Sequence, residues 1–124
     1  MERTNFEKLQ VYQLSEKIAD SIWNIVITWN TFARDTVGKQ IVRSADSIGA
    51  NIAEGSGRGS LVDNRRFVRM ARGSLYETLH WLRRCYTRKL LSQSEVKSLR
   101  GLVQELSPKL NAFLRSVDER AKSR

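Results

Sequence analysis

The apolar residues in the last third of the chain recur every three and four positions, and this spacing constrains the fold more than any other feature. The set comprises Val96, Leu99, Val103, Leu106, Leu110, Phe113 and Val117. Because an α-helix turns once in ~3.6 residues, these side chains share one side of a helix. Such a helix buries its stripe by packing against other helices. We therefore predict a helix over residues 93–117, with a kink at Pro108 and a frayed tail over 118–124.

Three earlier segments carry a similar apolar stripe, and they predict helices over residues 5–30, 36–54 and 61–90. The glycine-rich segment 55–59 separates the second helix from the third, with Gly55 placed for a left-handed C-cap. Ser60 with Asp63, and Ser92 with Glu95, have the spacing of helix start signals. We predict one all-α domain over residues 1–124, folded as an antiparallel up-down four-helix bundle.

The composition argues against several classes of protein. The sequence has no run of ~20 apolar residues and no apolar leader, so we expect a cytoplasmic protein without a membrane partner. A lone cysteine, Cys85, and a lone histidine, His80, give no disulfide and no multi-histidine metal site. Cys85 falls on the core side of its helix and is expected to be a buried apolar residue. We expect no catalytic residue, no metal and no cofactor.

Two glutamates on neighbouring predicted helices leave one enzymatic alternative open. Glu54 and Glu77 could form an acid–base pair. Together with Asn51 and Ser74, however, they are interpreted more simply as a polar layer that fixes the second and third helices or caps their ends.

Positive charge is concentrated in one predicted helix. The chain has 22 Lys and Arg against 13 Asp and Glu, a net charge of +9. At ~100° per residue, Arg65, Arg69, Arg72 and Arg83 fall within an arc of roughly 60° with Tyr76 beside them. Guanidinium groups with an aromatic ring suit phosphates and bases. The predicted nucleic-acid-binding residues are Arg58, Arg65, Arg66, Arg69, Arg72, Tyr76, Arg83, Arg84 and Arg88.

Two other interpretations of this basic face stay open. It could be an ordinary solvated helix face, although acidic residues would normally be interspersed along one. Part of it could instead meet acidic residues of a neighbouring subunit, since Glu7, Glu16 and Asp20 of the first helix also need partners.

The apolar arcs of the first and third helices are wider than a bundle stripe requires. Aromatic residues account for much of the excess, and aromatic residues are enriched at interfaces. We therefore predict a homo-oligomer whose interface includes Tyr12, Trp23, Trp81 and Tyr86.

Two short motifs carry a family resemblance. Residues 40–55, which end in Asn-Ile-Ala-Glu-Gly, and residues 73–77, Gly-Ser-Leu-Tyr-Glu, resemble the bacterial four-helix-bundle family of the 23S rRNA intervening-sequence protein. The opening Phe6–Tyr12 is similar as well. The motif residues that the resemblance marks are Asn51, Glu54, Gly55, Gly73, Ser74 and Glu77.

The resemblance implies more than the periodicity does. It implies a five-subunit barrel. The basic charge resembles that of one branch of the family, the accessory variability determinant (Avd) of diversity-generating retroelements. Avd is a basic pentamer that binds nucleic acid and partners a reverse transcriptase. The expected function is a non-enzymatic scaffold of this Avd-like kind, which binds RNA or DNA. The alternative is a structural or protein-interaction oligomer of the rRNA intervening-sequence type, without a direct nucleic-acid role.

Overall fold

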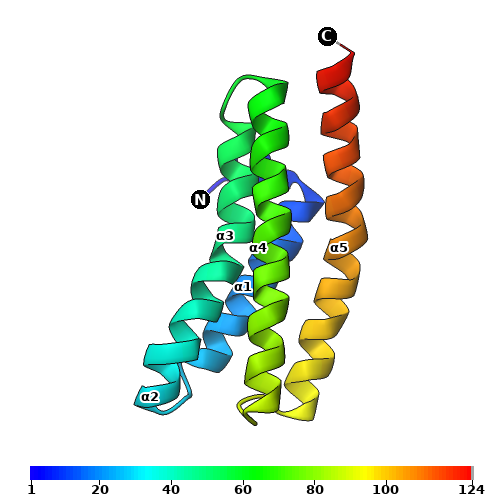
Figure 1. The fold of residues 1–124 in the computed structure, drawn as a ribbon. Coiled ribbons are helices and arrows are strands. Elements are labelled where there is room, and N and C mark those ends of the chain that lie inside the picture. The colour runs from blue at the N-terminus through cyan, green and yellow to red at the C-terminus, as the bar shows by residue number, and fades with distance from the viewer. Residues whose placement is uncertain (124) are drawn as a thin grey trace.

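Four long helices run up and down beside one another in the computed structural model, which describes residues 1–123 (Figure 1). They are α1 (Gln10–Val26), α3 (Lys39–Ser56), α4 (Leu61–Thr87) and α5 (Gln93–Lys122). Both α1 and α4 pack against α3 and α5, so the order around the bundle is α1, α3, α4, α5. The predicted antiparallel up-down four-helix bundle is confirmed.

The chain before α3 is less regular than predicted. The first helix does not span 5–30: a 3-10 turn over Phe6–Lys8 is followed by extended backbone at Leu9, and α1 ends at Val26. A short helix, α2 (Thr31–Ala33), then leads through a π-helical turn, η2 (Arg34–Gly38), into α3. Asn30 starts α2, because its side-chain oxygen accepts a hydrogen bond from the Ala33 N–H at 3.0 Å.

The last helix is longer than predicted. Ser92 and Glu95 form the expected reciprocal capping box, with bonds of 3.1 and 2.8 Å. The helix continues through Pro108, and the frayed tail predicted over 118–124 is wrong as far as Lys122, where α5 ends. Val117 is fully buried and anchors this last part of the helix. Arg124 lies outside the described residues.

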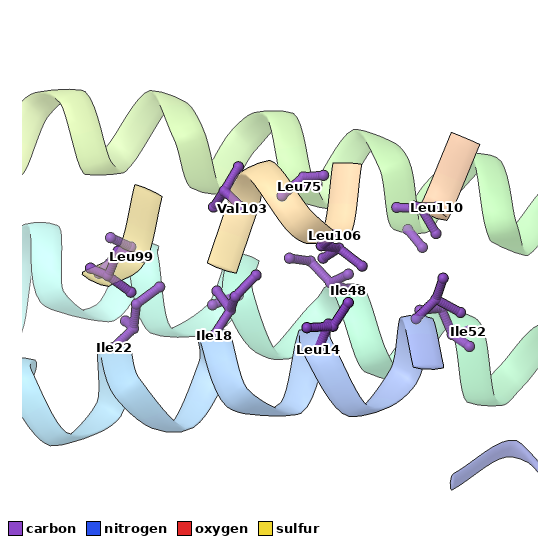
Figure 2. Close-up of a cluster of buried hydrophobic side chains, with 14 of the residues drawn as sticks. Leu14, Ile18, Ile22, Ile48, Ile52, Leu75, Leu99, Val103, Leu106 and Leu110 are labelled. Atoms are coloured by element: carbon purple, nitrogen blue, oxygen red, sulfur yellow. The ribbon is translucent and has the colours of Figure 1, made fainter. Parts of the chain in front are cut away.

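The core lies along the bundle axis and draws on every long helix (Figure 2). Its most deeply buried large side chains include Ile18, Ile22, Ile48, Ile52, Leu75, Leu99, Leu106 and Leu110. Burying such a side chain contributes roughly 1.5–3 kcal/mol, so this layer supplies the main stabilisation of the bundle. No helix within residues 1–123 has the length and apolar character needed to cross a bilayer.

Gly55 has a different role from the predicted left-handed C-cap, and that prediction is wrong. It lies inside α3 and is buried against α4. A Cβ atom there would lie 2.8 Å from Asn64 Oδ1 and 2.9 Å from Phe67 Cβ. The left-handed turn residue of this connection is Gly59, at φ 79°. Gly55 is therefore needed for the close approach of the end of α3 to the start of α4.

We predict that Gly55→Ala destabilises the protein by ~1–3 kcal/mol, because the new methyl group overpacks the α3–α4 contact. Gly73→Ala is the matched control, since a Cβ at Gly73 would meet nothing within 4 Å. That control is expected to be neutral or to stabilise by up to ~1 kcal/mol, because alanine favours helix more than glycine does. Urea unfolding measures both, and equal midpoints for the two variants would contradict the role of Gly55.

Candidate nucleic-acid interface

The arginines of α4 form two groups rather than one row. Arg72 and Arg83 are eleven residues apart, which is ~16 Å along a helix. Between them α4 exposes Tyr76, Leu79 and His80 rather than further cations. The group near the α3–α4 connection and the group near the α4–α5 connection therefore have different surroundings.

Two arginines near the α3–α4 connection lie over an aromatic ring. The guanidinium carbons of Arg58 and Arg66 lie 4.8 and 4.7 Å from the centroid of the Phe67 ring. Phe67 is buried between α3 and α4, so its ring is held in place by the fold. Cation–π contact with such a ring is worth ~0.5–1 kcal/mol at an exposed site and orients both arginines.

Carboxylates near these two arginines neutralise them only weakly. Glu54 lies 3.3 Å from Arg58 and Asp63 lies 3.4 Å from Arg66. Both pairs are exposed and join residues that are three or four positions apart in the chain. Exposed ion pairs of this kind contribute little to stability. The side chain of Arg66 remains 60% exposed and is free to meet an anion.

Two further arginines share a single carboxylate on α5. Asp118 Oδ1 lies 3.2 Å from Arg65 and 3.5 Å from Arg69. Arg65 is 26% exposed, whereas Arg69 is 51% exposed. Arg72 also faces α5, where its Nη1 donates to Asn111 Oδ1 at 3.5 Å. Arg65 and Arg72 thus help to hold α5 on α4, and Arg69 is the more accessible member.

We name Arg58, Arg65, Arg66 and Arg69 the α3–α4 arginine cluster. Three of its members surround a shallow hollow of about 440 Å³, together with Val62 and Met70. Val62 and Met70 are large exposed apolar residues. The hollow therefore offers an apolar surface for a base beside guanidinium groups for phosphates.

Arg83, in the second group, lines a groove between α4 and α5, which we name the α4–α5 groove. It has a volume of about 980 Å³. Its lining includes the apolar residues Leu79, Leu82, Leu91, Val96, Leu99 and Val103 and the cations Arg83, Lys97 and Arg100. Arg83 was predicted from the sequence, whereas Lys97 and Arg100 were not. Their spacing of three, beside the apolar stripe of the same helix, was the available signal.

The residues of the two sequence motifs do not act as one unit. Asn51 donates to the Ser47 carbonyl at 2.9 Å and to Ser74 Oγ at 3.4 Å, which links α3 to α4. Glu77 instead accepts a hydrogen bond from Trp81 Nε1 at 3.1 Å, and Glu54 pairs with Arg58. The structure does not bring the two glutamates together as an acid–base pair. Gly73 faces open space.

Comparison with known proteins decides the family. The sequence profile described as 23S rRNA-intervening sequence protein matches residues 7–112. The chain belongs to this family. A crystal structure from Bacteroides thetaiotaomicron, of a protein with unknown function from the S23 ribosomal protein family, is similar with a TM-score of 0.72 and 26% identity. The match covers 83% of this chain and 96% of that one. No curated protein is similar enough to match the chain.

In this member of the intervening-sequence protein family, the predicted interface aromatics differ in exposure. Trp23 and Tyr86 remain exposed. Tyr12 packs edge-on against Phe6, with 5.1 Å between the ring centroids. Trp81 is half-buried and packs edge-on against His80, with 4.7 Å between the ring centroids. Trp23 and Tyr86 are therefore the two that keep most surface for another molecule.

Cys85 lies in the core of α4 and is fully buried. Burial raises the pKa of its thiol to about 11, because the charged thiolate is disfavoured away from water. Within residues 1–123, no three His, Cys, Asp or Glu side chains gather as a set that could hold a metal ion.

We predict that Cys85 does not react with a thiol-specific disulfide reagent at pH 8 in the folded protein. With a pKa of about 11, only ~0.1% of the thiol is ionised at that pH, and the thiolate is the reactive form. Unfolding in urea is expected to speed the reaction by ~100-fold or more. A rate that is unchanged by urea would contradict the buried placement.

Proposed function

We propose that this protein is a non-enzymatic nucleic-acid-binding scaffold, an Avd-like accessory to a reverse transcriptase in a diversity-generating retroelement, and that it works as a homo-oligomer. One observation carries the nucleic-acid part. The α3–α4 arginine cluster presents exposed guanidinium groups beside an apolar hollow, and the chain has a net charge of +9.

The chemistry of this cluster favours a phosphate backbone. Each guanidinium presents paired N–H donors to phosphate oxygens, and the Phe67 ring orients two of these groups. Val62, Met70 and, further along α4, Tyr76 give exposed surfaces on which bases can lie. Such contacts are independent of base sequence, so we expect binding to single-stranded or structured RNA and DNA with little sequence preference.

The reverse-transcriptase role rests on the resemblance described above together with the basic charge. A reverse transcriptase gene beside this one, with paired template and variable repeats, would support the role. Co-purification of the two proteins after nuclease treatment would show that they bind directly. A location within an rRNA gene would count against the role.

The second candidate is a structural or protein-interaction oligomer of the rRNA intervening-sequence type. The apolar α4–α5 groove and the exposed Trp23 favour it, because both are surfaces that suit protein rather than phosphate. Partners that survive nuclease treatment, combined with absent RNA binding at low salt, would favour this second function.

We predict that replacing Arg58, Arg66 and Arg69 with Gln weakens RNA binding and flattens its salt dependence. The slope of log affinity against log salt is negative, and each lost phosphate contact should reduce its magnitude by about 0.7–0.9. Fluorescence anisotropy with a labelled structured RNA, over 50–300 mM salt, measures this change.

The matched control removes the same charge elsewhere, by replacing Lys8, Lys17 and Arg34 with Gln. These three side chains are exposed and lie outside α4. Their replacement should leave most of the slope intact. Equal losses in the two triple variants would show that net charge, rather than this cluster, governs binding.

Asp118 gives a prediction of the opposite sign. Asp118→Asn removes the carboxylate that Arg65 and Arg69 share, so both guanidinium groups become available to phosphate. We expect tighter RNA binding and a salt slope steeper by about 0.7–0.9 for each added phosphate contact. Glu105→Gln removes a carboxylate that pairs with Lys109 on the same helix and serves as the control. Unchanged binding in Asp118→Asn would argue that the cluster does not contact RNA.

A further inference from the structure

The outer surface between α3 and α4 carries a second group of cations, at the end opposite the α3–α4 arginine cluster. Thr78 Oγ1 of α4 donates to Ser44 Oγ of α3 at 3.0 Å, which fixes the register of this antiparallel pair. Lys39 lies five residues before Ser44. Arg84 lies six residues after Thr78, so the two cations are at the same level of the bundle. This level is near the lower end in Figure 1.

We name Lys39, Arg43, Arg84 and Arg88 the second basic patch. Arg43 is one helical turn from Lys39 on α3, and Arg88 is one turn from Arg84 on α4. Arg84 is half-buried and the other three are exposed. Over residues 1–123 none of the four forms an ion pair, whereas every member of the α3–α4 arginine cluster does. The second basic patch is therefore the less compensated of the two groups.

The patch and the cluster lie on one line along the bundle. Arg66 and Arg84 are eighteen residues apart, which is five complete helical turns and ~27 Å along α4. On α3, Arg43 and Glu54, the partner of Arg58, are eleven residues or about three turns apart. Each helix thus presents both groups on the same side, and one extended ligand can reach both.

Helix dipoles explain only half of the second basic patch. Arg84 and Arg88 lie at the carboxyl end of α4, where cations are stabilised. Lys39 begins α3, whose amino end stabilises anions instead, and the first turn of α3 holds no acidic residue. Like charges gathered without carboxylate partners repel one another. A bound anion would relieve this repulsion.

The surface between the two groups suits a base better than a phosphate. Gly73 leaves open space above its backbone, and Trp81 is half-buried. Glu77 lies between the groups on α4, and its carboxylate accepts a hydrogen bond from Trp81 Nε1 at 3.1 Å. The carboxylate repels phosphate, whereas the uncovered part of the indole ring can stack on a base. Phosphate donors at both ends with an aromatic ring between them favour a nucleic acid over an acidic protein.

We propose that a single strand of nucleic acid lies along the outer α3–α4 surface and contacts both the α3–α4 arginine cluster and the second basic patch. A single strand is favoured over a duplex because only its bases are free to stack. Stacked nucleotides are ~3.4 Å apart, so a span of ~27 Å takes about eight of them. Two contacts made by one strand act together and bind more tightly than either alone. This contact rests on the proposed nucleic-acid function and names the length of strand that it needs.

The length of the strand gives the test. The patch variant K39Q/R43Q/R88Q removes the three exposed cations and keeps the half-buried Arg84. Fluorescence anisotropy with labelled, unstructured RNAs of four, eight and twelve nucleotides measures the affinity. The unaltered protein should bind the twelve-nucleotide RNA about 10-fold or more tightly than the four-nucleotide RNA. The patch variant should lose most of this gain, and its salt slope should fall in magnitude by about 0.7 for each lost contact.

The matched control, K8Q/K17Q/R115Q, removes three exposed cations that lie outside α3 and α4. It should keep the gain with length. Circular dichroism checks that both triple variants are folded, which is expected because all six side chains are exposed. Equal losses in the two variants would overturn the proposal. A patch variant that binds the twelve-nucleotide RNA as tightly as the unaltered protein would also overturn it, and would leave the patch to an acidic protein partner.

Glu77→Gln tests the path of the strand without removing a cation. Glutamine keeps an acceptor for Trp81 Nε1 and removes the negative charge between the two groups. The twelve-nucleotide RNA should bind roughly 2- to 5-fold more tightly, the effect of one exposed charge. The four-nucleotide RNA, which reaches only one group, should change less. Unchanged or weaker binding of the longer RNA would contradict a strand that crosses this surface.

The outcomes separate the two-ended contact from the proposed function. The Arg58, Arg66 and Arg69 to Gln variant should also lose the gain with length, because the strand then has only one group to hold it. If the unaltered protein binds RNA without a gain between four and twelve nucleotides, the two-ended contact is wrong and the proposed function stands. If it binds no RNA of any length at low salt, both are wrong.

Discussion

The close contact between the end of α3 and the start of α4 is the constraint on which the candidate site depends. With Gly55 in place, Asn64 and Phe67 of α4 approach the backbone of α3 at distances that leave no room for a Cβ atom. This contact buries Phe67, and the guanidinium groups of Arg58 and Arg66, which come from the two sides of the connection, lie over its ring. The orientation of the exposed guanidinium groups is therefore a consequence of helix packing and not of the arginines alone.

The seam between α4 and α5 has two different ends. Towards the C-terminus of α5, Asp118 and Asn111 meet arginines of α4 and close the seam with polar contacts. Towards its N-terminus the seam opens into the α4–α5 groove, where apolar side chains are left partly uncovered beside Arg83, Lys97 and Arg100, which form no ion pair within residues 1–123. Polar pairing at one end and an open groove at the other give a single helix pair two surfaces of different chemistry.

The sequence allowed the four long helices, most of the core and the placement of Cys85 to be predicted, because periodicity reports which side of a helix is buried. Periodicity does not reveal which residues of the adjacent helices contact the margins of that buried side. Gly55 was interpreted as a C-cap because a glycine after an apolar run is explained either by a left-handed cap or by a close approach of two helices. Only the short distance from Gly55 to Phe67 distinguishes the two explanations. Asp118 was assigned to a frayed tail because it follows Val117, the last residue of the apolar stripe, and its contacts with Arg65 and Arg69 appear only when α5 is placed against α4. Lys97 and Arg100 gained meaning only when α5 was placed against α4.

The distribution of charge changes the meaning of the basic helix. Counted along the sequence, the arginines of α4 form one polyanion-binding row, but the fold gives them three different tasks. Arg65 and Arg72 are partly used to hold α5, Arg83 lines an apolar groove, and Arg66 and Arg69 remain largely open to solvent. Since counterion release depends on the cations that reach phosphate, the number of accessible guanidinium groups and not the net charge would set the electrostatic part of the proposed nucleic-acid binding. Asp118 therefore matters more than its single charge suggests, because it limits two arginines at once.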